Sequence, residues 1–113
     1  MDQANIAKRG IRPDTASLYR LKIDRLNADS QRDPEECLKA SFLWMSHARL
    51  PPRILYHIRQ ARALSYDSLE RLEEAEAEVV LAIDHLVSCR PPMPRPGIWL
   101  CVKWALVMLQ RIG

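Results

Sequence analysis

The sequence predicts an all-α fold of about five helices arranged as antiparallel helical hairpins. Apolar residues recur every three or four positions through most of the chain, which is the period of an amphipathic helix. No run of residues gives a competing strand signal, and the three glycines are too few for a turn-rich β fold. The chain has 113 residues, of which 48% are hydrophobic and 27% charged, as expected for one globular domain.

The first helix is expected to follow an N-terminal arm. Residues 1–13 lack apolar periodicity, and we predict a flexible arm there, followed by a single helical domain over residues 14–113. A cap at Asp14 or Thr15 would start a helix that runs to about Ala28. The polar residues over 27–32 predict a break after it.

The second and third helices have sharp starts. Asp33 can cap the second helix, and Pro34 suits its first position. Apolar residues occupy almost the whole circumference of this helix, which predicts that it is buried between neighbouring helices. Pro52 opens the third helix, which is expected to end near Leu64 and to be followed by a turn over residues 65–69.

The fourth helix is predicted over residues 70–87 and the fifth over residues 98–112. The glutamates of the fourth helix are expected to solvate one side of it; they are Glu70, Glu73, Glu74, Glu76 and Glu78. Four prolines within residues 88–97 predict a stiff, extended linker between the two helices. The fifth helix is apolar around its whole circumference apart from Lys103 and its last turn. It is therefore expected to lie in the core, to contact another chain or a second copy, or to contact a membrane.

One segment, about residues 55–87, has small and large side chains in a recurring order. These residues are Ala63, Tyr66, Leu72, Ala75, Val79 and Ala82. The pattern resembles a tetratricopeptide repeat, although Glu70 stands where that family has a loop glycine. The resemblance implies a right-handed stack of helical hairpins that holds a peptide or helix of another protein. Small proteins of this kind include chaperone-like adaptors.

No motif for catalysis, metal binding or cofactor binding is present. The histidines His47, His57 and His85 have no ligand partner at metal-binding spacing, so we predict a protein that is not an enzyme and has no cofactor. Cys37 and Cys101 lie in apolar runs and are expected in the core. Cys89, beside Arg90 in the sequence, is a candidate for a reactive thiol. The cysteines and the absence of a secretory signal predict a cytoplasmic location.

The charge is polarised along the chain, with a net charge of +3 overall. Residues 67–86 contain seven acidic and one basic side chain, whereas residues 1–66 and 87–113 are basic. Such a surface favours a protein partner or a second copy of the chain. A basic DNA-binding regulator is an alternative, because one cluster of cations could face nucleic acid. These cations are Lys8, Arg9, Arg12, Arg20, Lys22 and Arg25, extended by Arg49, Arg53, Arg59 and Arg62.

The sequence thus predicts a non-enzymatic protein–protein interaction module that binds a peptide or an amphipathic helix in an apolar groove. The predicted partner-binding residues are Tyr56, Arg59, Arg62, Tyr66, Trp99 and Trp104. The alternatives are the DNA-binding regulator and an obligate homodimer that uses residues 98–112 as its interface. No apolar run is long enough for a helix that spans a membrane.

Overall fold

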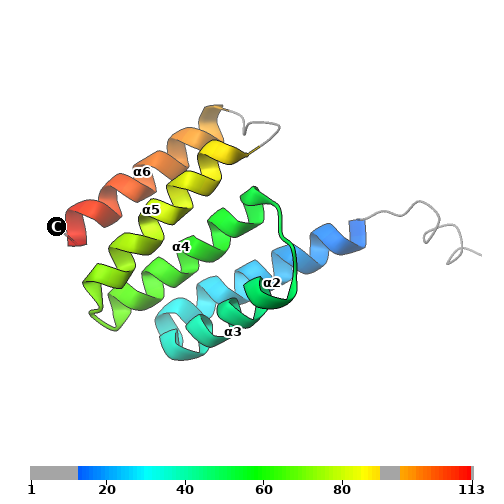
Figure 1. Ribbon diagram of the computed structural model, residues 1–113, viewed down its shortest axis with the longest axis horizontal. Helices are drawn as coiled ribbons and strands as arrows, with labels where there is room; N and C mark the ends of the chain where they lie inside the picture. Colours follow the sequence, from blue (N-terminus) through cyan, green and yellow to red (C-terminus); the bar gives the residue numbers. More distant parts are fainter. Residues whose placement is uncertain (1–12, 90–94, 113) are drawn as a thin grey trace, which may run out of the picture.

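The computed structural model describes residues 13–89 and 95–112, and every regular element within these ranges is an α-helix. The predicted all-α fold is confirmed for this part of the chain. Figure 1 shows each helix antiparallel to the one before it, so that α2, α4 and α6 run in the same direction. The bounds are α2 Pro13–Arg32, α3 Pro34–His47, α4 Pro52–Ser68, α5 Leu72–Ser88 and α6 Arg95–Ile112.

Helix α4 lies in the middle of the arrangement and is packed on two opposite sides. It contacts α2 and α3 on one side and α5 on the other (Figure 1). The buried residues of the first side are Leu26, Cys37, Leu50, Ile58 and Ala61. Those of the second side, where α6 also contributes, are Tyr56, Ala63, Val79, Ala82, Cys101, Ala105 and Met108. The apolar core therefore continues from α2 to α6 through α4.

The small residues of the repeat-like segment lie in the interface between α4 and α5. Ala63, Ala75 and Ala82 have no solvent-accessible surface. Side chains of this size allow two helix axes to approach closely, because nothing larger than a methyl group separates the backbones. The prediction that these alanines mediate close helix packing agrees with their burial.

Helices α2 and α3 are separated by Asp33 alone, so the predicted break over residues 27–32 is wrong. Helix α2 continues to Arg32 because its polar side chains find partners within it: Ser30 Oγ donates to the Asn27 carbonyl at 2.6 Å, and Asp29 accepts from Arg32 at 3.0 Å. The predicted cap is confirmed, since the Asp33 carboxylate accepts a hydrogen bond from the Glu36 amide at 3.3 Å.

Helix α4 continues to Ser68, so most of the turn predicted over residues 65–69 is helical and that prediction is wrong. Ser65 is buried, and its hydroxyl donates to the Ala61 carbonyl at 2.9 Å, so this polar residue is satisfied inside the helix. The chain then reverses at Glu70, whose φ of 60° lies in the left-handed region. Glycine is favoured at such a position, because a residue with a Cβ raises the conformational free energy of the folded chain there by about 1 kcal/mol.

Helix α6 begins at Arg95, three residues before its predicted start. Pro96 is tolerated because the first turn of a helix has no intrahelical acceptor for its amide. The predicted linker over residues 88–97 is therefore wrong at both ends, since α5 includes Ser88 and α6 includes residues 95–97. Its middle, residues 90–94, lies outside the described residues. Residues 1–12 of the predicted N-terminal arm also lie outside them. Helix α2 begins at Pro13, so the predicted start at Asp14 or Thr15 is wrong.

Helix α3 is not buried all round, contrary to the prediction. Phe42 is 61% exposed and Leu43 is 48% exposed, whereas Cys37 and Ser41 are fully buried. The reason is that α3 packs with one face on α2 and α4, and no described helix covers its opposite face.

We expect the close approach of α4 and α5 to be sensitive to side-chain volume at Ala82. An Ala82→Leu substitution should lower the free energy of unfolding by about 1–3 kcal/mol, because the added atoms have no space between the helices. Urea unfolding followed by circular dichroism measures the change. Ala77→Leu is the matched control, since Ala77 lies on the exposed side of the same helix. Equal losses in the two variants would contradict the proposed packing.

Candidate interaction surface

Helix α6 is the last helix of the row and packs with one face only (Figure 1). Cys101, Ala105 and Met108 form its buried face, at spacings of four and three residues, and each is at most 9% exposed. The end of the helix is held by an ion pair of 2.9 Å between Arg111 and Asp67 of α4. These contacts fix the rotation of α6 about its axis and so decide which side chains point away from the protein.

The opposite side of α6, which we term the outer α6 face, is apolar and uncovered in the described structure. The exposed fractions of its large side chains are 65% for Trp99, 67% for Leu100, 56% for Leu106 and 51% for Val107. Lys103 and Gln110 are the exposed polar residues among them. The helix therefore has a core face and a second apolar face that faces solvent.

The predicted partner-binding residues are divided between the surface and the interior. Trp99 is exposed on the outer α6 face. Tyr56 is 2% exposed and packs edge-to-face on Trp104, with ring centroids 6.1 Å apart. Burial raises the pKa of the Tyr56 hydroxyl. Tyr56 and Trp104 thus join α4 to α6 and leave Trp99 as the aromatic side chain on the surface of this helix.

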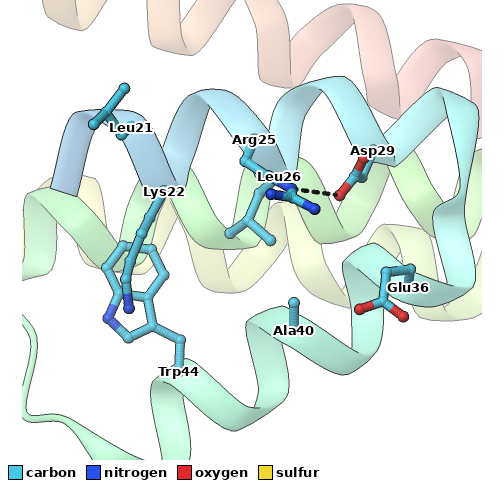
Figure 2. A pocket seen from close by; sticks show the side chains of 8 residues that line it. All are labelled: Leu21, Lys22, Arg25, Leu26, Asp29, Glu36, Ala40 and Trp44. Atoms are coloured by element: carbon cyan, nitrogen blue, oxygen red, sulfur yellow. Dashed lines mark ion pairs between the residues drawn. The ribbon is translucent and has the colours of Figure 1, made fainter. Parts of the chain in front are cut away.

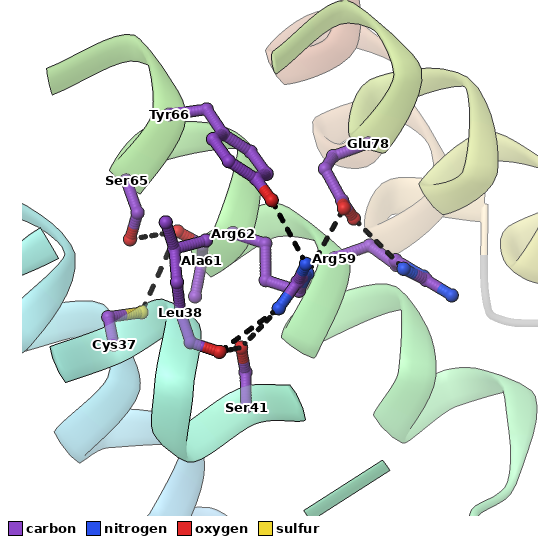
Figure 3. A network of polar contacts seen from close by, with 9 residues as sticks. All are labelled: Cys37, Leu38, Ser41, Arg59, Ala61, Arg62, Ser65, Tyr66 and Glu78. Carbon is purple, nitrogen blue, oxygen red and sulfur yellow. Dashed lines mark hydrogen bonds and ion pairs between the residues drawn. The ribbon is translucent and has the colours of Figure 1, made fainter. Parts of the chain in front are cut away.

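The other three predicted residues, Arg59, Arg62 and Tyr66, belong to a polar network between α3, α4 and α5 (Figure 3). Arg62 Nε and Arg59 Nη1 donate to the two carboxylate oxygens of Glu78, at 3.0 and 3.1 Å. Arg62 also donates to Ser41 Oγ at 2.8 Å and to the Tyr66 hydroxyl at 3.2 Å. These arginines are engaged inside the chain and do not line the outer α6 face.

Glu78 was expected among the solvated glutamates of its helix, and that expectation is wrong. It is 6% exposed and lies between two guanidinium groups. The available signal in the sequence was the spacing of Arg59 and Arg62, which places two cations on one side of α4. Both arginines are paired with Glu78 and lie largely inside the chain, so they are not part of a fully exposed basic surface.

The described structure also contains two surface pockets beside α2. Figure 2 shows the first, of about 380 Å³, between α2 and α3, where the Lys22 ammonium lies 5.0 Å from the centre of the Trp44 ring. The second, of about 410 Å³, lies between α2 and α4. Its lining includes Tyr19, Arg20, Ile23, Arg53 and His57. Lys22 belongs to the basic cluster predicted from the sequence, whereas Tyr19 and Trp44 are not among the predicted binding residues.

All three cysteines are buried. Cys37 Sγ lies 3.4 Å from the Leu26 carbonyl, and burial raises the pKa of its thiol. The predicted core positions of Cys37 and Cys101 are confirmed. Cys89 is buried as well, which protects its sulfur from the solvent. Among the described residues no group of His, Cys, Asp and Glu could hold a metal ion, and none of the described helices is long and apolar enough to cross a membrane.

Comparison of the chain with protein-family models, curated proteins and solved structures found no match.

We expect the Glu78 network to contribute strongly to stability. Glu78→Ala removes the carboxylate between two largely buried guanidinium groups, and the free energy of unfolding should fall by about 3 kcal/mol. Urea unfolding measures the loss. Glu74→Ala is the matched control, because the Glu74–Arg71 pair on the same helix is exposed and its loss should leave the unfolding midpoint unchanged. Similar midpoints for the two variants would contradict the role of Glu78.

Two histidines should make the fold less stable in acid. Burial lowers the pKa of His57 and of His85, and the nearby Arg53 and Arg59, respectively, lower them further. The unfolded chain, with an imidazole pKa of about 6.5, then binds more protons than the folded chain as the pH falls below about 7. Stability should therefore decrease through this range and level off below the folded-state pKa values.

Urea midpoints at several pH values between about 5.5 and 7.5 test this dependence. The double variant His57→Gln/His85→Gln should flatten the pH profile, whereas His47→Gln, at an exposed position, should retain it. An unchanged profile in the double variant would assign the pH dependence to other groups.

Proposed function

We propose that this protein is a non-enzymatic protein–protein interaction module that binds a helix of another protein on the outer α6 face. The observation that carries the proposal is the exposure of Trp99, Leu100, Leu106 and Val107 along one side of a terminal helix. Contiguous exposed apolar residues of this size mark binding sites on protein surfaces, since their exposure to water is unfavourable. Tryptophan is also enriched in interface cores.

The geometry of α6 supports a helical partner. Trp99 and Leu106 are seven residues apart, as are Leu100 and Val107, and seven residues are about two helical turns. The four side chains therefore form two adjacent rows along the helix. Ridges of this kind pack into the grooves of a second helix, as the helices of this chain do with one another. A partner helix would give α6 a second packed side, as α4 has.

The resemblance to tetratricopeptide repeats supports a scaffolding role. Alternate helices run in the same direction, and Ala63, Ala75 and Ala82 lie between α4 and α5 as that pattern requires. The uncovered side of a helix in a repeat stack is normally polar. The outer α6 face is apolar, which favours an adaptor or small chaperone-like protein that binds a partner there. The buried cysteines Cys37 and Cys101 favour a reducing compartment, and we propose a cytoplasmic location.

An obligate homodimer through residues 98–112 is the second candidate. Trp99 and Leu100 precede Lys103 by four and three residues, and Leu106 and Val107 follow it by three and four. Two antiparallel copies of α6 would therefore place apolar side chains opposite one another. Light scattering distinguishes the candidates, because a homodimer has twice the monomer mass of 13.1 kDa.

Selection of helical peptides displayed on phage tests the proposed function. Peptides that bind the wild-type protein are expected to lose binding to a Trp99→Ser/Leu106→Ser variant, because that variant removes one of the two apolar rows of the outer α6 face. Phe42→Ser is the matched control, since Phe42 is a similarly exposed apolar residue on α3. Selected peptides that bind the α6 variant as well as the wild type would show that another surface binds them and would overturn the proposal.

A further inference from the structure

Lys103 occupies the middle of the outer α6 face. It is exposed, and it makes no ion pair with any residue in the described part of the chain. Residues 95–112 contain no acidic side chain that could neutralise it, and Arg111 is paired with Asp67. The centre of the apolar face is therefore a single positive charge.

A helix that covers the apolar residues must also cover Lys103. The distance along the axis from Trp99 to Val107 is about 12 Å at 1.5 Å per residue, and Lys103 lies at its midpoint. A charged group that loses water without gaining a partner is strongly unfavourable. The methylene groups of the lysine can pack against apolar neighbours, but its ammonium group needs an acceptor.

A second copy of the chain would not supply that acceptor. Antiparallel pairing of two α6 helices places Lys103 of each copy at the two-fold axis, where the two ammonium groups repel each other. The apolar residues of the pair would match, but their centre would contain two like charges.

We infer that the partner of the outer α6 face is an amphipathic helix with an acidic residue in the middle of its apolar stripe, positioned to pair with Lys103. This inference rests on the proposed function and adds the partner's charge. Electrostatic complementarity at the centre of an interface selects the partner and its register, since a helix shifted by one turn would leave both charges unpaired.

Two synthetic helical peptides of about 18 residues test the inference. Both carry leucines three and four positions on each side of a central residue, which is Glu in one peptide and Lys in the other. Fluorescence anisotropy of the labelled peptides gives their affinities. The Glu peptide should bind the wild-type protein roughly tenfold more tightly than the Lys peptide. Lys103→Glu should reverse this preference.

Each alternative result has a distinct meaning. Equal binding of both peptides to the wild type, lost in Leu106→Ser, would overturn the inference about Lys103 and leave the proposed function intact. Binding of neither peptide would overturn both. A mass of twice 13.1 kDa in light scattering, reduced to the monomer by Leu106→Ser, would assign the face to a second copy and overturn the inference.

Two further measurements complete the test. Circular dichroism checks that Lys103→Glu folds, and Lys103→Gln, which should bind the two peptides equally, replaces it if it does not. Vesicles of phosphatidylcholine with phosphatidylserine test a membrane surface. Binding to these vesicles that requires Lys103, without a preference between the peptides, would overturn the inference in favour of an anionic lipid surface.

Discussion

The carboxylate of Glu78, held between Arg59 and Arg62, is the contact on which the arrangement of the helices depends. Its two oxygens accept from different arginines of α4, and Arg62 also donates to Ser41 Oγ of α3. A buried charge is tolerated only when its partners are in place, so α3, α4 and α5 can combine in few registers. The apolar contacts around the network stabilise the fold, whereas the network selects which residues meet.

The helices form a row around α4, and the helix at each end of the row has one face that no other described helix covers. Helix α2, at one end, exposes Leu18 and Leu21 beside charged residues such as Lys22 and Arg25. Helix α6, at the other end, exposes four large apolar side chains with only Lys103 between them and Gln110 about one turn further on. Several charges interrupt the exposed apolar residues of α2, whereas a single charge interrupts the outer α6 face, so that face gains most from a partner.

The number and type of the helices followed from apolar periodicity and from caps such as Asp33–Pro34, which depend only on local sequence. The breaks over residues 27–32 and 65–69 were mispredicted, because polar residues there are satisfied by their own helix. The burial of Glu78 was not predicted, since its partners are 16 and 19 residues away in sequence and the spacing of Arg59 and Arg62 does not by itself identify the acceptor. Trp99 and Trp104 looked alike in one apolar run, and only the docking of Cys101, Ala105 and Met108 separates the exposed ring from the packed one.

On the proposed function, the single charge on the outer α6 face has a consequence for the unbound protein. An uninterrupted apolar face on a terminal helix would pair with its own copies, because the hydrophobic effect does not distinguish one apolar surface from another. Lys103 opposes that pairing at the centre of the face. Its ammonium group stays hydrated until a carboxylate of a partner replaces the water. The same residue that lowers the affinity for a second copy therefore raises the affinity for an acidic helix, and the preference is the sum of the two effects.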